Sequence, residues 1–236
     1  MNDQHIASAF DRDLEAIQAR IMKMGGLVEE AIMKSARSLE LHDEELAQEV
    51  RQNDKVIDQM EETINEEAAR VIALRAPMSV DLRLVLSVIK VAGNLERIGD
   101  YSKNIAKRTT ILAQTQPIND SAAALRRMAR EVERMLKDAL DAYIQRDAEL
   151  AQDVIDRDEE VDQMYNALFR EFLTFMMEDP RNITPCMHLH FIGKNIERMG
   201  DHVTSIAEQV VYLVTGETPD EIRTKADVTS VANGKE

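Results

Sequence analysis

The chain repeats itself at an interval of about a hundred residues, and this duplication limits the folds it can adopt. Nine of sixteen positions are identical between 45–60, ELAQEVRQNDKVIDQM, and 149–164, ELAQDVIDRDEEVDQM. Seven of fifteen are identical between 94–108, NLERIGDYSKNIAKR, and 195–209, NIERMGDHVTSIAEQ. The two offsets, 104 and 101, are nearly equal, so a unit with more than one element occurs twice in tandem.

Apolar residues recur at spacings of three and four along six segments, which is the pattern of amphipathic helices that share a buried seam. Short connections between long helices favour antiparallel neighbours. We therefore predict an all-α fold of two tandem, pseudo-symmetric three-helix bundles with six long antiparallel helices. The first bundle is expected over 1–116, the second over 117–216, and a flexible C-terminal tail over 217–236. The breaks between helices are expected near 42–43, 76–77, 116–117, 146–147, 180–185 and 216–219.

Composition and charge exclude several classes of protein. The formal net charge of −15 argues against nucleic acid as a partner, because phosphates need a cationic surface. Cys186 is the only cysteine, so no intrachain disulfide forms and a reducing compartment is expected. The N-terminus lacks the features of a secretory signal, and Lys90 interrupts the longest apolar stretch, so no transmembrane segment is expected. We predict a cytoplasmic protein.

Pairs of acidic residues four positions apart border the apolar seam in both halves. Like charges at this spacing destabilise a helix by about 0.2–0.5 kcal/mol per pair, so four such pairs indicate that a cation compensates them. On antiparallel neighbouring helices the two pairs of each half would converge. The eight residues are Asp54, Asp58, Glu96, Asp100, Asp158, Asp162, Glu197 and Asp201.

Two kinds of cation compete for this role. The first is an arginine, because Arg97 and Arg198 each precede the second acid of their pair by three residues. The second is a hard metal ion held by two carboxylates from each of two helices. Glu61 would extend the acidic stripe in the first half, but Tyr165 takes its place in the second, so the two sites are not identical.

Gly99 and Gly200 occupy equivalent positions inside the repeated phrase. A glycine inside a helix costs up to about 1 kcal/mol relative to alanine, so some other contribution must offset it. We predict that a neighbouring helix approaches closely at both positions.

These residues resemble a known family. The doubled ERIGD and ERMGD phrases, the doubled D-x-x-x-D phrases and RAPMSVDLR at 75–83 are similar to those of the PhoU family of bacterial phosphate-signalling regulators. The resemblance covers residues 5–215, and its fold is the pair of three-helix bundles predicted above.

The resemblance implies a function that spacing alone does not. PhoU proteins repress the phosphate-starvation response when phosphate is plentiful, linking the ATPase subunit of the phosphate ABC transporter to a sensor histidine kinase. The resemblance also implies a homodimer, a location in the cytoplasm or peripheral to the inner membrane through its partners, and modulation of phosphate uptake. Some members bind iron or zinc at E(D)-x-x-x-D motifs, which correspond here to the eight carboxylates named above.

Three functions therefore compete. The first is a non-catalytic adaptor that acts through protein contacts and has no catalytic residues. The second is a metal-dependent hydrolase or oxidase, which needs open coordination positions and a tuned general base. The chain lacks the Glu-x-x-His pairs of di-iron bundles as well as any P-loop, dinucleotide fingerprint or nucleophile elbow. A passive scaffold, the third, would not need repeated like-charge pairs.

Overall fold

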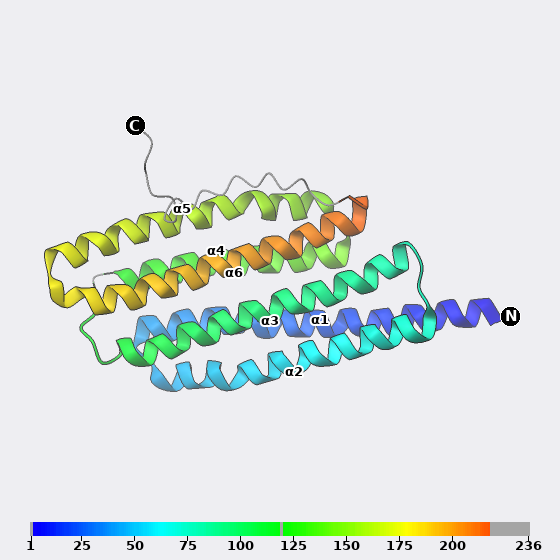
Figure 1. The fold of residues 1–236 in the computed structure, drawn as a ribbon, viewed down its shortest axis with the longest axis horizontal. Helices are drawn as coiled ribbons and strands as arrows, with labels where there is room; N and C mark the ends of the chain where they lie inside the picture. The colour runs from blue at the N-terminus through cyan, green and yellow to red at the C-terminus, as the bar shows by residue number, and fades with distance from the viewer. Residues whose placement is uncertain (1, 119, 218–236) are drawn as a thin grey trace.

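The protein is folded almost entirely into helices. The computed structural model describes residues 2–118 and 120–217, with side chains from Phe10 onward, and these residues contain six long α-helices, one 3₁₀ helix and no strand (Figure 1). The predicted all-α fold with six long helices is confirmed. The helices are α1 (Asn2–Leu41), α2 (Glu44–Arg75), α3 (Val80–Leu112), α4 (Ser121–Gln145), α5 (Ala148–Glu178) and α6 (Ile183–Thr215), and the 3₁₀ helix η1 (Pro180–Asn182) precedes α6.

The helices end where the sequence predicts, and the duplication includes the capping residues. Asp43 caps α2 by accepting a hydrogen bond from the backbone N–H of Leu46 at 2.9 Å. Asp147 lies 104 residues later and caps α5 by accepting from the N–H of Leu150 at 3.0 Å. Of the predicted tail at 217–236, only Glu217 lies within the described residues.

Four helices form the centre of the molecule, and α2 and α5 flank it on opposite sides (Figure 1). Helix α2 packs against α1 and α3, and α5 packs in the same way against α4 and α6. The halves meet where α3 contacts α6 and where α1 contacts α4. The rings of Tyr101 and His202, which occupy equivalent positions in the two repeats, lie 5.7 Å apart between centroids. Equivalent residues that touch must lie near the axis relating the halves, so the pseudo-two-fold axis passes between α3 and α6.

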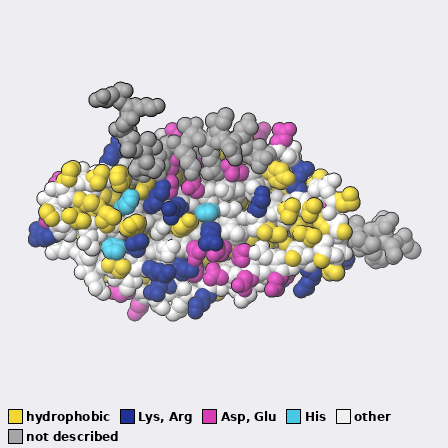
Figure 2. Space-filling view, in the orientation of Figure 1, with side chains coloured by type: hydrophobic (Ala, Val, Ile, Leu, Met, Phe, Trp, Pro, Cys, Tyr) yellow, Lys and Arg dark blue, Asp and Glu magenta, His cyan; other side chains and the backbone are white. Residues whose placement is uncertain are grey.

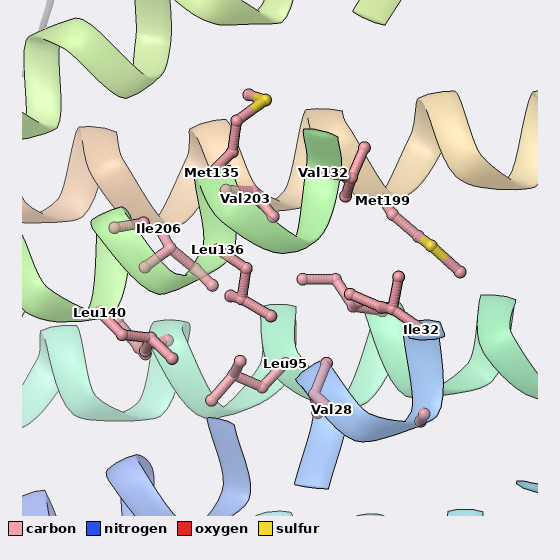
Figure 3. Close-up of a cluster of buried hydrophobic side chains, with 14 of the residues drawn as sticks. Val28, Ile32, Leu95, Val132, Met135, Leu136, Leu140, Met199, Val203 and Ile206 are labelled. Atoms are coloured by element: carbon pink, nitrogen blue, oxygen red, sulfur yellow. The ribbon is translucent and has the colours of Figure 1, made fainter. Parts of the chain in front are cut away.

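A single hydrophobic cluster extends through both halves. Figure 3 shows Val28 and Leu95 of the first half facing Leu136 and Ile206 of the second. All four side chains are almost completely buried, and the same cluster includes residues from each of the six helices. The two bundles are therefore structural repeats that share one core. No helix within the described residues is long and apolar enough to cross a membrane.

Gly99 and Gly200 mark close contacts between helices, as predicted. A Cβ atom at Gly99 would lie 3.2 Å from Cδ1 of Ile57, so α2 approaches the backbone of α3 at this point. A Cβ atom at Gly200 would lie 3.0 Å from Oδ1 of Asp158, which belongs to α5. The second glycine thus makes room for a carboxylate, which connects the packing of the bundle to the acidic residues beside it.

Candidate functional site

The four predicted acidic residues of the first half lie together between α2 and α3. Asp54 is buried, with 4% of its surface exposed, and Asp58, Glu96 and Asp100 are partly buried around it. The ammonium group of Lys103 joins the two helices, since it donates hydrogen bonds to Oδ2 of Asp54 and, at 2.6 Å, to Oδ1 of Asp100. Repulsion from Asp54 and Asp100 acts on Asp58, and repulsion from Asp100 and Asp58 acts on Glu96, so the four carboxyl groups lie within electrostatic reach of one another.

The positive charge that compensates the four carboxylates is mainly that of the Lys103 ammonium group. Burial alone would lower the pKa of Lys103, but its hydrogen bonds to Asp100 and Asp54 outweigh burial and raise this pKa above its usual value. Arg97 contributes as predicted, with contacts of 3.3 Å to both Glu96 and Asp100, although its side chain is 59% exposed. Lys103 follows Asp100 by three residues, and this helical spacing is the signal that could have identified it.

The pKa values of Glu96 and Asp100 shift in opposite directions. Burial, followed by repulsion from Asp100, raises the pKa of Glu96 to about 7. Burial would also raise the pKa of Asp100, but hydrogen bonds from Lys103 and Glu96 hold it below its ordinary value. Burial and the charge of Asp54 raise the pKa of Asp58. Near neutral pH the cluster therefore carries less negative charge than four ionised carboxylates would.

In the second half Asp158 of α5 lies against α6, and a different lysine pairs with the buried Glu197. Oδ1 of Asp158 lies against Gly200, and Glu197, which is 5% exposed, accepts a hydrogen bond from Nζ of Lys194 at 2.8 Å. Nζ of Lys194 also lies 5.2 Å from the ring centroid of Tyr165, a cation–π distance. Asp162 of α5 is buried, and Asp201 of α6 is partly buried.

The two lysines do not occupy equivalent positions. At the repeat offset of 101, Lys194 of the second half corresponds to Gly93 of the first. Lys103 of the first half corresponds to Thr204 of the second. Tyr165, which replaces Glu61 of the first half, is buried and supports Lys194. The expected difference between the two acidic sites is therefore present, and it lies in the neutralising cation as well as in the acids.

A hard metal ion fits the chemistry of the first cluster. Its donors are carboxylate oxygens, and Oδ1 of Asp54 is buried without a hydrogen-bond partner among the described residues. The ammonium group of Lys103 lies between Asp54 and Asp100, so an ion would have to displace it. Within 2–118 and 120–217, no group of three or more Asp, Glu, His or Cys side chains is already arranged around one ion position. Metal ligation by the eight residues stays a prediction.

Exposed apolar side chains gather toward the two ends of the molecule. Figure 2 shows hydrophobic groups near both ends of one face and acidic groups between them. Leu74 and Met78 lie at the connection between α2 and α3, where they are 70% and 78% exposed. Met177 and Ile183 lie at the equivalent connection between α5 and α6, where they are 79% and 48% exposed. Such side chains at the tips of helical hairpins are candidate contact points for other proteins.

The PhoU domain matches the chain twice, over residues 21–109 and 125–210. The chain belongs to the PhoU family. The two matches coincide with the two structural repeats. The resemblance drawn from the doubled acidic phrases is therefore confirmed.

Relatives of known name align along nearly their whole length. A phosphate-specific transport system accessory protein PhoU homolog from Rhizobium meliloti is 47% identical over 98% of this chain and 97% of its own. The crystal structure of PhoU from Pseudomonas aeruginosa has a TM-score of 0.85 and 39% identity, covering 88% of this chain and 100% of that one. That of the phosphate transport system regulatory protein PhoU from Streptococcus pneumoniae has a TM-score of 0.82 and 32% identity, covering 89% and 99%.

Replacing Glu96 by Gln is expected to stabilise the protein only at neutral and higher pH. Folding raises the pKa of Glu96 from 4.5 to about 7, so the folded state binds the extra proton and its stability falls as pH rises through this interval. Glutamine keeps an N–H donor for Asp100 but cannot ionise. The free energy of unfolding in urea should rise by about 1 kcal/mol near pH 8, allowing for solvent screening, and should not rise below pH ~4.5.

Two further variants make this test specific. Glu66→Gln, on an exposed part of α2, removes a carboxylate outside the cluster and should show no such gain. Asp100→Asn removes an ionised partner of Lys103 and Arg97 and should lower stability near pH ~8. A Glu96→Gln variant that is no more stable than the wild type at the higher pH would show that folding does not raise the pKa of Glu96.

Proposed function

We propose that this chain is an accessory protein of a phosphate-specific transport system that represses the phosphate-starvation response when phosphate is plentiful. It acts without catalysis, as an adaptor between the ATPase subunit of the phosphate ABC transporter and the sensor histidine kinase that controls the response. The observation that carries the proposal is the alignment of both repeats, over 98% of the chain, with a relative whose name describes such an accessory protein.

The physical form of the molecule supports an adaptor. All six helices share one core, so the two halves are held to each other by buried contacts. The exposed methionines Met78 and Met177 lie in equivalent hairpins of the two repeats. Methionine side chains adapt well to varied partner surfaces, which suits a protein that contacts more than one partner.

The deletion strain tests this function. Removing the gene should switch on a reporter of phosphate-starvation genes in phosphate-rich medium, because the sensor kinase is no longer inhibited. Removing the sensor kinase as well should silence the reporter again, and restoring the wild-type gene to the single deletion should do the same. A single deletion that leaves the reporter off in phosphate-rich medium would contradict the proposed function.

We also propose that the acidic clusters bind a divalent or trivalent metal ion, with iron and zinc as the first candidates. Asp54, Asp58, Glu96 and Asp100 would hold the ion in the first half, and it would relieve the repulsion among them. The supporting observation is the buried Oδ1 of Asp54, which finds no hydrogen-bond partner among the described residues. The bound ion would supply structural charge neutralisation and no reaction.

Metal addition should therefore raise the melting temperature of chelator-treated protein. A ligand that binds only the folded state adds about 2.7 kcal/mol at a hundredfold excess over Kd, which corresponds to roughly 5 °C or more for a chain of this size. Asp54→Asn should reduce this rise and the amount of metal measured by mass spectrometry. Asp81→Asn, on an exposed part of α3, is the matched control and should retain both.

Each variant is compared with and without metal, so any change in its own stability cancels. A wild-type melting temperature that does not respond to iron or zinc would refute metal binding. An equal rise in Asp54→Asn would refute its assignment to the first cluster.

A further inference from the structure

A groove between α1 and α2 is positively charged on an otherwise acidic molecule. It has a volume of ≈ 450 Å³, and Arg20 and Lys23 of α1 face Lys55 of α2 across it. None of the described residues that line the groove is Asp or Glu, although the whole chain has a net charge of −15. Cationic side chains are therefore concentrated in the lining of this groove.

Two of the three cations form no ion pair within residues 2–118 and 120–217. Arg20 forms an ion pair with Glu67, with 2.7 Å between Nε and Oε2. Lys23 and Lys55 are exposed and form no ion pair with any residue that the structure describes. Two ammonium groups on opposite walls of the groove are thus available to an external anionic group.

The part of the groove formed by α2 also has an apolar strip. Val56, which is 49% exposed, and Met60 lie one turn apart on α2, and Thr63 continues the same stripe. Positions 56 to 63 span about 10 Å along the helix, which is two turns. The groove lining combines apolar and cationic side chains, so it matches an occupant with one apolar and one acidic face.

The second half has the same scaffold, but α5 carries acids where α2 carries Lys55 and Val56, while Arg127 of α4 keeps the positive charge of Lys23. With the offset of 104, Gln163 and Met164 repeat Gln59 and Met60, whereas Lys55 corresponds to Glu159. Val56 corresponds to Glu160, and both glutamates are exposed. The packing of a three-helix bundle therefore does not require the lysine and the valine, and a separate explanation is needed for them.

We propose that the groove between α1 and α2 binds an acidic amphipathic helix of a partner protein. Glutamates or aspartates on that helix would meet Lys23 and Lys55, and its apolar residues would cover Val56 and Met60. A small phosphate-bearing anion could pair with the lysines but would leave the apolar strip exposed to water. The inference rests on the proposed adaptor function, because an adaptor must present a docking surface to a protein partner.

A designed peptide tests the groove directly. A fluorescein-labelled helical peptide of about 18 residues, with a leucine stripe flanked by glutamates, should bind the full-length protein in an anisotropy titration. The same peptide with lysine in place of glutamate should not bind. Charge reversal in K23E/K55E should weaken binding of the acidic peptide by about tenfold or more. R127E/R130E changes the net charge equally on exposed positions of α4 and should leave the affinity within about twofold.

The outcomes separate this inference from the function on which it rests. Equal affinity in K23E/K55E, with an unchanged melting temperature, would overturn the proposal, and so would failure of the acidic peptide to bind the wild type. Displacement of the bound peptide by inorganic pyrophosphate or ATP at equimolar amounts would identify a small-anion site and overturn it as well. The reporter in the deletion strain does not enter this assay, so failure of repression and failure of the groove are distinguishable.

Discussion

Carboxylates beside a buried seam need a cation close to them, and much of this structure follows from that requirement. Withdrawing an ionised carboxylate from water costs several kcal/mol unless a charged partner and hydrogen bonds replace the lost solvation. Asp54 and Glu197 are about as buried as the apolar residues around them, with 4% and 5% exposed. The chain meets the requirement with Lys103 in one half and Lys194 in the other. An external metal ion would take over a role that an ammonium group already fills in the first half.

The two repeats share one scaffold and differ in the charges placed on it. Helix caps, seam residues and the glycines that allow close approach recur in both halves, since each is needed for packing. The neutralising lysines do not recur, because Lys103 corresponds to Thr204 and Lys194 to Gly93. Lys55 of the first half likewise does not recur, because Glu159, with the opposite charge, takes its place in the second. The molecule therefore presents different chemistry on equivalent surfaces of its two halves.

The helices and the duplication could be predicted because local sequence determines them. Asp43 and Asp147 mark helix starts, and the apolar periodicity continues to the next break. The seams did not reveal that both halves share one core, because an apolar stripe identifies a buried face but not the helix that covers it. The prediction that Arg97 neutralises Asp100 was correct but incomplete. Which cation also reaches Asp54 depends on how α3 is rotated about its own axis relative to α2. That rotation places Lys103 inward and leaves the side chain of Arg97 59% exposed.

The stability of Lys103→Met without metal is the most direct test of this account. The substitution keeps the length of the side chain but removes the ammonium group from Asp54 and Asp100, while Lys107→Met removes an exposed lysine of the same helix. Urea denaturation of chelator-treated protein near pH ~7.5 should show a loss of about 2 kcal/mol for Lys103→Met and a change within about 0.5 kcal/mol for Lys107→Met. Equal stability of the two variants would contradict the claim that an internal cation holds the acidic cluster together.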